Sequence, residues 1–295
     1  MATDAVTMRK PAGRRLAGFF HRHPRLRVGS LLAAPMAWLV VLYLGSLVLL
    51  LVTAFWTVDP LSGSVIKEFS LENFKELVDV PVYRDIVWRT VRTAILVTVT
   101  DAVIAFPIAF YMAKLAGRKT KALLVVAVLM PLWASYLVKV IAWRAMLAEH
   151  GVINWALHPL GISGPGEGVA AVWLTMSYLW LPYMILPVFA GLERIPDSLI
   201  SASEDLGAHP LTTFRRVILP LSFPAVVAGS IFTFSLTLGD YITPKLVSNE
   251  TFIGNSIYEQ ITNNQPFAAA FAMVPIVIVI GYLGVARKLG AFEHV

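Results

Sequence analysis

Long apolar stretches dominate the chain and set its fold class. Residues 31–55 and 267–283 contain no charged side chain, whereas a membrane β-barrel would alternate apolar and polar residues over segments of about ten residues. A membrane-crossing helix needs about 20 apolar residues. Six such spans can be drawn, at residues 31–56, 87–111, 123–143, 169–190, 218–242 and 267–286. The pattern predicts an all-α integral membrane protein with six transmembrane helices.

Two of the segments between these spans carry patterns of their own. Residues 58–86 place apolar side chains at spacings that suit one helix face, namely Phe69, Leu71, Phe74 and Leu77. This predicts a short amphipathic helix lying on the membrane surface. Residues 146–168 are rich in glycine and proline, which predicts an external loop of turns.

Composition supports the membrane interpretation. Hydrophobic residues make up 57% of the 295 positions and charged residues only 14%, whereas about 25% charged residues is typical of soluble domains. Six spans with their loops leave no room for a large catalytic domain outside the membrane. The absence of cysteine excludes disulfides and thiolate metal sites.

Positive charge is distributed unevenly among the segments between the spans. Most of the 24 lysines and arginines fall in residues 9–27, in residues 114–121, after the fourth span and after the sixth. By the positive-inside rule, these segments and both termini are cytoplasmic. The net charge of +6 is therefore explained by topology, and a nucleic-acid partner is not expected.

These boundaries predict three parts of the chain. A basic cytoplasmic tail comprises residues 1–30, the six-span transmembrane domain residues 31–286, and a second cytoplasmic tail residues 287–295. Within the transmembrane domain, residues 192–217 form a cytoplasmic loop between the fourth and fifth spans. Membrane lipid is the surrounding medium.

The chain lacks the residues that a membrane enzyme would need. Its histidines occur in tails and loops without metal-ligand spacing, at His21, His23, His150, His158, His209 and His294. Residues 116–120 resemble a phosphate-binding loop only in part, because the glycine pair is missing. No metal or cofactor site is expected in this chain. If ATP drives its activity, another subunit must bind the nucleotide and its Mg²⁺.

The cytoplasmic loop carries the sharpest pattern in the sequence. Pro196 suits a first helical turn, residues 197–206 contain no helix breaker, and Gly207 can adopt the positive φ that ends a helix. Pro210 then suits the start of a second helix. Two short helices around a break are therefore predicted. The small residues at 201–203 would let the first helix pack closely against a partner.

This segment resembles the Glu-Ala-Ala loop of permease subunits of bacterial ABC importers. Ser201-Ala202-Ser203 stands where that motif has Glu-Ala-Ala, Gly207 follows at the motif's spacing, and residues 217–220 end in Ile-Leu-Pro. The resemblance implies a type I-like permease fold and a coupling helix that docks on a cytoplasmic ATPase. It implies that the coupling residues are Ser201, Ala202, Ser203, Asp205, Leu206, Gly207 and Ala208. Because Ser201 replaces the glutamate, a salt bridge from that position is not expected.

Two other segments are similar to those of spermidine/putrescine-type permeases. These are residues 131–143, in the third span, and residues 238–247, at the end of the fifth. The resemblance implies a subunit of the prokaryotic inner membrane that carries polyamines. It also implies three kinds of partner, namely a second homologous permease, a dimer of ATPase subunits, and an extracytoplasmic substrate-binding protein.

Two acidic residues within the spans are candidates for contact with cargo. Asp101 lies near the middle of the second span, where a charge is costly, and either packs against a neighbouring Thr or Ser or lines the path. Asp240 lies where the fifth helix is expected to loosen. A polyamine needs carboxylates for its ammonium groups and aromatic faces for its methylenes. Tyr241, Trp133, Tyr136 and Trp143 could supply those faces, or belong to the interfacial aromatic belt.

Cations near Asp240 leave its role open in another way. Lys139 and Arg144 lie in the outer part of the third span and are expected either to extend outward or to pair with Asp240.

Two other functions of the chain also remain open. One is import of a different solute, such as an opine, a phosphonate or a metal complex. The other is secondary transport, which would require inverted repeats and midplane ion sites.

Overall fold

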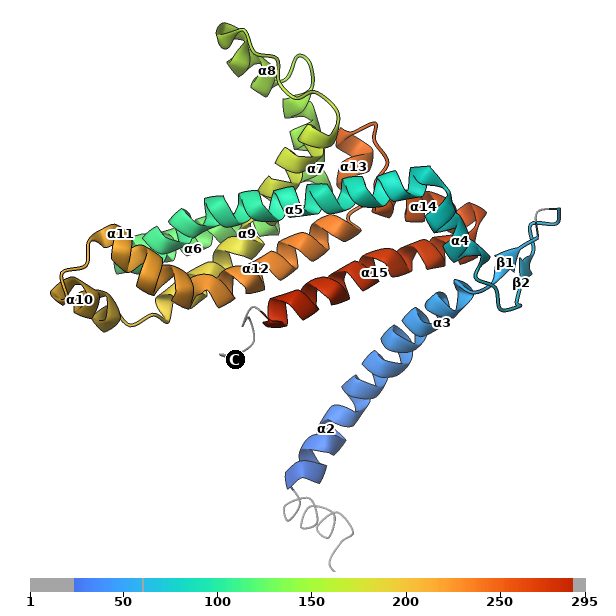
Figure 1. Ribbon diagram of the computed structural model, residues 1–295, viewed down its shortest axis with the longest axis horizontal. Helices are drawn as coiled ribbons and strands as arrows, with labels where there is room; N and C mark the ends of the chain where they lie inside the picture. Colours follow the sequence, from blue (N-terminus) through green and yellow to red (C-terminus); the bar gives the residue numbers. More distant parts are fainter. Residues whose placement is uncertain (1–23, 60, 289–295) are drawn as a thin grey trace, which may run out of the picture. The chain divides into compact units, whose positions relative to one another are not determined.

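The computed structural model in Figure 1 describes residues 24–59 and 61–288 and divides the chain into two units, which meet in sequence at Thr53 and Ala54. Most of the predicted basic tail and of the predicted C-terminal tail lies outside the described residues. The architecture is almost entirely helical.

The first unit contains one long apolar helix in three consecutive parts. These are α2 (Pro24–Trp38), the π-helical segment η1 (Leu39–Leu44) and α3 (Gly45–Thr53). Apolar side chains such as Trp38 and Val41 are exposed, which suits a helix surrounded by lipid tails. The helix begins before the predicted start at residue 31 and ends before residue 56.

The second unit contains the remaining helices and one small hairpin. Strands β1 (Thr57–Val58) and β2 (Val65–Ile66) pair antiparallel, with Thr57 opposite Ile66. The long helices are α5 (Pro81–Phe110) with its π-helical end η2 (Tyr111–Leu115), α9 (Val169–Glu193), α12 (Leu219–Gly239) and α15 (Gln265–Lys288). The short helices include α10 (Asp197–Asp205), α11 (Pro210–Thr213) with the π-helical η4 (Phe214–Ile218), α13 (Ile242–Val247) and α14 (Ile253–Asn263).

Helices α5, α9 and α12 form the core of this unit. Trp173 on α9 donates a hydrogen bond to the Thr100 hydroxyl on α5 over 3.0 Å, which helps to fix their register. Gly191 on α9 faces Ala225 on α12 so closely that an added Cβ would lie 2.2 Å from the alanine methyl. Small residues allow such close contact between membrane helices. The core therefore depends on backbone proximity as well as on side-chain packing.

The third predicted span is broken in the structure. Helix α6 (Arg118–Trp133) meets the segment Tyr136–Leu160, which begins with helix α7 (Tyr136–Leu147), at an angle of 91°. The prediction of one continuous span over residues 123–143 was therefore wrong. Pro131 lacks an N–H and lies near the C-terminus of α6, where the carbonyls have no helical partner. Lys139 Nζ donates a hydrogen bond to the Pro131 carbonyl over 3.1 Å and satisfies one of them.

Among the described residues, five helices are long and apolar enough to cross a membrane, and the bent pair α6–α7 would be the sixth. The other predicted spans match α2–α3, α5, α9, α12 and α15, with bounds that differ by several residues. The prediction of a fold built from membrane-spanning helices is confirmed.

The two segments that were predicted to be external differ in how closely the structure follows the prediction. The amphipathic helix appears as α4 (Glu72–Asp79), although Phe69 precedes it and stacks on Phe55 with ring centroids 5.3 Å apart. The loop at residues 146–168 is not made of turns alone, because it contains α8 (Val152–Leu157) and the 3-10 turn η3 (His158–Leu160). Gly151, at the N-terminus of α8, has no room for a Cβ, which would lie 2.3 Å from the Met146 carbonyl.

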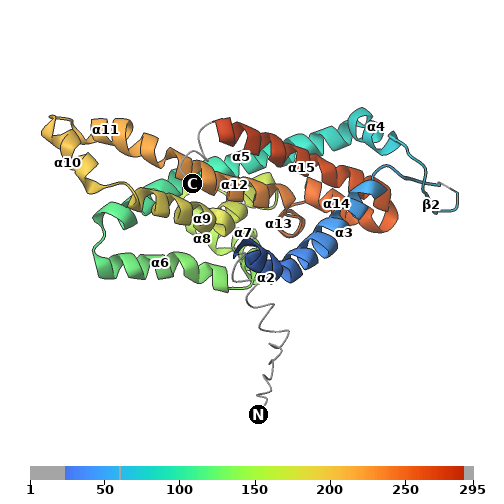
Figure 2. The ribbon, with the colours of Figure 1, turned by 90° about the horizontal axis from the view of Figure 1, so that it is seen from below.

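Candidate functional sites lie at opposite ends of this second unit. Figures 1 and 2 both show α10 and α11 at one end of the bundle and α4 and α14 at the other. Helix α13 lies near α14 in Figure 1, and the connection from α12 to α13 is therefore far from α10.

Candidate functional site

The predicted helix break in the loop at residues 192–217 is present. Helix α10 ends at Asp205, and Gly207 has a φ of +77°. The Gly207 amide donates to the Glu204 carbonyl over 2.8 Å, and the Ala208 amide donates to the Ser203 carbonyl over 3.1 Å. This pair of bonds forms a Schellman motif, which requires a left-handed residue after the helix. Pro210 begins the next helix as predicted.

The coupling residues predicted by resemblance divide into two groups. Five are exposed, namely Ser201, Ala202, Asp205, Leu206 and Gly207. Ser203 and Ala208 are partly buried, and the Ser203 hydroxyl lies 2.9 Å from the Thr213 hydroxyl on α11. Ser203 therefore ties the two short helices together.

One face of α10 exposes apolar side chains to the surroundings. Leu199, Ala202 and Leu206 are three and four residues apart, a spacing that places them on one helix face. All three are exposed, and Leu206 is 89% exposed. A contiguous apolar face of this kind suits contact with another protein.

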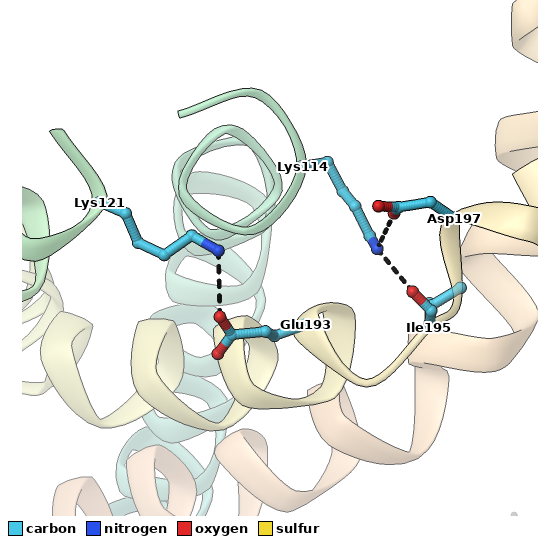
Figure 3. A network of polar contacts seen from close by, with 5 residues as sticks. All are labelled: Lys114, Lys121, Glu193, Ile195 and Asp197. Carbon is cyan, nitrogen blue, oxygen red and sulfur yellow. Dashed lines mark hydrogen bonds and ion pairs between the residues drawn. The ribbon is translucent and has the colours of Figure 1, made fainter. Parts of the chain in front are cut away.

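Two lysines outside the loop form hydrogen bonds near its start, and only Lys114 contacts α10 itself (Figure 3). Lys114 on η2 donates to the Ile195 carbonyl over 2.6 Å and to Asp197 Oδ1 over 2.7 Å. Lys121 on α6 donates to Glu193 Oε1 over 3.0 Å. The hydrogen bond and the charge of Lys114 hold the pKa of the Asp197 carboxyl below its ordinary value of 3.8. In the sequence, both lysines served only as markers of topology.

Asp240 lies where α12 ends and α13 begins, and its carboxylate accepts hydrogen bonds on both oxygens. Oδ1 accepts from the Ile242 amide over 2.9 Å and, more weakly, from the Thr243 amide over 3.4 Å. Oδ2 accepts from the hydroxyls of Tyr136 and Thr243, which lie 2.7 Å from each other. Tyr136, Asp240 and Thr243 together are called the Asp240 corner. The carboxylate both caps α13 and binds the start of α7.

Of the two alternatives for Lys139 and Arg144, pairing with Asp240 was wrong. Lys139 donates to the Pro131 carbonyl, and Arg144 lies 3.8 Å from Glu167. Within the described residues, no lysine, arginine or histidine forms an ion pair with Asp240. The hydrogen-bond donors around the Asp240 carboxylate are therefore all neutral groups.

The aromatic residues predicted around Asp240 are only partly brought together. Tyr136 stacks on Trp180 of α9 with ring centroids 5.9 Å apart, and Trp180 meets Tyr183 edge-on. Tyr241 instead stacks on Tyr258 of α14, at 4.7 Å. Trp133 ends α6 and is 79% exposed. Trp143 lies against Tyr178, at 5.4 Å. Of the four aromatics proposed from sequence, Tyr136 alone forms a hydrogen bond with Asp240 in the structure.

Asp101 is fully buried in the core on α5. Its side chain is 0% exposed, and neither carboxylate oxygen has a hydrogen-bond partner within the described residues. A hydrogen bond to a Thr or Ser on a neighbouring helix, which was one of the two expectations, is therefore not formed. Asp101 does not share a hydrogen bond with the Asp240 corner either.

The comparison with known families decides the class of the protein. A family model described as "Binding-protein-dependent transport system inner membrane component" matches residues 84–288. The chain belongs to this family. It is therefore a multi-pass inner membrane component of a transport system and not itself an enzyme, as predicted. The family also sets aside the secondary-transporter alternative.

Two relatives within this family are similar along most of their length. The "Inner membrane ABC transporter permease protein YdcU" of Escherichia coli (strain K12) is 45% identical, with 96% of each chain covered. The "Spermidine/putrescine transport system permease protein PotB" of the same organism is 30% identical, with 83% of this chain and 91% of that protein covered. The resemblance stated from residues 131–143, 201–220 and 238–247 is confirmed at the level of the family.

Two solved structures share the fold of this family member. A bacterial alginate ABC transporter, in complex with an alginate pentasaccharide-bound periplasmic protein, has a TM-score of 0.71 at 14% identity, covering 93% of this chain and 96% of that chain. The MetNI methionine ABC transporter has a TM-score of 0.56 at 19% identity, covering 72% and 97%. At these identities the likeness concerns the fold alone.

Three side chains of this permease contribute to the two sites without having been singled out from the sequence. Thr243 follows Asp240 by three residues, a spacing typical of helix capping that could have identified it. Trp180 and Lys114 gave no such signal. Their roles arise from contacts with residues more than 40 positions away in the chain.

Proposed function

We propose that this family member is the permease subunit of an ATP-driven importer of polyamines such as spermidine and putrescine. The observation that carries the proposal is the similarity to PotB, a spermidine/putrescine permease by name, over 83% of this chain. The segments that contain Tyr136 and Asp240 are also those that resemble polyamine permeases in sequence.

The Asp240 corner suits the chemistry of such a cargo. A polyamine carries ammonium groups separated by methylenes, so it needs negative charge next to aromatic faces. Asp240 supplies a charge that no described cation neutralises, and the stacked rings of Tyr136 and Trp180 supply the faces. Tyr241, Trp133 and Asp101 stay predicted contacts, which another conformation of the permease would have to bring to the path.

Helix α10 is proposed as the coupling helix. Its exposed face of Leu199, Ala202 and Leu206 would dock in a groove of a cytoplasmic ATPase, which binds ATP and Mg²⁺. The concentration of lysine and arginine on this side of the membrane supports cytoplasmic termini and a cytoplasmic α10. The remaining partners are a second permease and an extracytoplasmic binding protein. Closure of the ATPase dimer would then open the spans outward to accept cargo.

The test is transport by the reconstituted complex. The tagged chain is purified with its ATPase and placed in proteoliposomes with the binding protein. Radiolabelled spermidine and putrescine are then compared with methionine and an alginate oligosaccharide as stimulators of ATP hydrolysis and as cargo. The proposal expects stimulation and uptake with a polyamine only. Stimulation by another solute, with none by either polyamine, would reject the polyamine assignment and keep the importer.

A substitution tests the site within the same assay. Asp240→Asn keeps a side-chain oxygen for capping α13 and removes the charge. Because a hydrogen bond to a charged group contributes about 1.5–3 kcal/mol, we expect polyamine uptake to fall about tenfold or more. Asp79→Asn is the matched control, since Asp79 is an exposed acid at the end of α4. Normal uptake by Asp240→Asn would remove Asp240 from the cargo path.

One observation favours a different cargo with the same machinery. The Asp240 carboxylate already accepts four hydrogen bonds, about as many as its two oxygens can hold. A purely structural Asp240 would be compatible with import of another small solute. The solute panel separates this alternative from polyamine import.

A further inference from the structure

One face of the α5–η2 helix ends in a lysine. Phe106, Phe110 and Lys114 follow one another at intervals of four residues, and residues four apart lie on the same helix face. In a pure α-helix, each interval of four residues rotates the position by about 40°. The π-helical segment η2 takes more residues per turn and offsets that rotation. The three side chains therefore form one continuous stripe, called the α5 stripe.

The α5 stripe contacts the start of the loop through Lys114. This side chain is only 9% exposed, and its ammonium binds the Ile195 carbonyl and the Asp197 carboxylate. Ile195 follows the end of α9, and Asp197 is the first residue of α10. As Figure 3 shows, one ammonium group therefore holds the joint between α9 and α10 from both sides of Pro196.

The same stripe contacts the end of the loop through its two phenylalanines. Phe214, at the start of η4, meets Phe106 edge-on at 5.5 Å and Phe110 at 6.4 Å, with interplanar angles of 85°. The bond between Ser203 and Thr213 ties α10 to the segment just before Phe214. A movement of α10 therefore reaches α5 through both ends of the loop.

We propose that Lys114 is a positioning residue that transmits the movement of α10 to α5. A buried ammonium must stay paired, because an unpaired buried charge is costly. Lys114 must therefore follow Ile195 and Asp197 when the joint moves, and α5 moves with it. This inference rests on the proposed coupling role of α10. It makes α5 respond to the ATPase together with α9 and α12, which are covalently joined to the two ends of the loop.

The experiment compares three variants in the purified complex of permease, ATPase and binding protein. Lys114→Met removes the ammonium and keeps the apolar stem, whereas Lys114→Arg keeps a cation. Lys121→Met is the matched control, because Lys121 also forms an ion pair with an acidic residue near the end of α9 but does not contact α10. Two quantities are measured for each complex. One is the amount of ATPase subunit that stays bound, and the other is the rate of ATP hydrolysis with and without the loaded binding protein.

The expected result separates positioning from assembly. The Lys114→Met complex still contains its ATPase subunits and keeps its basal rate of ATP hydrolysis. Stimulation of that rate by the binding protein falls about tenfold, within the range typical of coupling between sites. Lys114→Arg recovers most of that stimulation, and Lys121→Met is unaffected. Unchanged stimulation in Lys114→Met, or equal losses in the Lys114 and Lys121 variants, would overturn the inference alone. A wild-type chain that retains no ATPase would overturn the proposed function together with it.

Discussion

Helix α10 and helix α13 lie at opposite ends of the bundle, and each depends on one residue next to a helix end. At α10 this residue is Gly207, which has a positive φ. The hydrogen bonds donated by the Gly207 and Ala208 amides involve only residues within six positions of one another. At α13 it is Asp240, whose carboxylate also binds Tyr136, 104 residues away in the chain. The first arrangement is local and exposed, whereas the second is long-range and partly buried. The turn at Gly207 can therefore present α10 to a partner protein, whereas the Asp240 corner can hold a carboxylate inside the bundle.

The largest effect should come from breaking the local turn. Proline fixes φ near −65° and lacks an N–H, so Gly207→Pro conflicts with the φ of +77° and removes the bond to Glu204. A conflict of this kind costs on the order of 3 kcal/mol. We therefore expect the amount of ATPase subunit that co-purifies with the chain to fall at least about tenfold.

The chain offers a close control for that turn. Gly161 also has a positive φ, of +66°, and donates its amide to a carbonyl three residues earlier, that of His158. It lies in the other loop, after η3. Gly161→Pro should leave ATPase retention unchanged, and an equal loss in both variants would indicate a general folding defect in place of a coupling surface.

A smaller effect is expected from weakening the long-range corner. Tyr136→Phe removes the hydroxyl shared by Asp240 and Thr243 and keeps the ring on Trp180. Because a net hydrogen bond contributes about 1 kcal/mol, polyamine uptake should fall about fivefold, with ATPase retention unchanged. Tyr183→Phe is the control, since Tyr183 also packs against Trp180. A loss of ATPase from Tyr136→Phe would contradict the separation of the two sites.

Asp101 provides a third contrast, because it is an acid with no hydrogen-bond partner in the described structure. Removing a buried polar group that has no hydrogen-bond partner should relieve a desolvation cost of about 1–3 kcal/mol. We expect Asp101→Ala, which removes both carboxyl oxygens, to raise the thermal unfolding temperature by a few degrees, about 2–4 °C per kcal/mol for a chain of this size. Asp85→Ala, an exposed substitution on the same helix, should leave it unchanged. A lowered temperature for Asp101→Ala would show that the carboxyl group makes favourable contacts.

The smallest effect concerns the ion pair that holds α10. The pKa of Asp197 lies below 3.8 because Lys114 favours the charged carboxylate. Its contribution to stability is therefore fully present above pH 3.8 and is lost as the pH falls through the lowered pKa. The unfolding temperatures of wild type and Asp197→Asn should differ by a constant amount at higher pH and converge below it. Because Asp197 is 85% exposed, the difference should be small.

The loop was predicted more fully than the Asp240 corner because the residues that shape the loop lie close together in the sequence. Pro196, Gly207 and Pro210 act through the conformations that their own backbones allow, so their effect can be predicted without knowing the fold. The break between α6 and α7 was missed because the apolar pattern continues through it. Lys139 was expected near Asp240 from its depth in the span, but its side chain binds Pro131 across the break instead.

The sequence by itself determined that this chain crosses a membrane with apolar helices, and it determined the helix break at Gly207. Hydropathy and backbone conformation are properties of short segments, which is why they could be predicted. Only the tertiary structure decided which side chains meet. It brought Tyr136 to Asp240, left Asp101 without a hydrogen bond, and placed the Lys114 ammonium on the joint between α9 and α10. Such contacts depend on the packing of whole helices, which residue spacing along one helix does not specify.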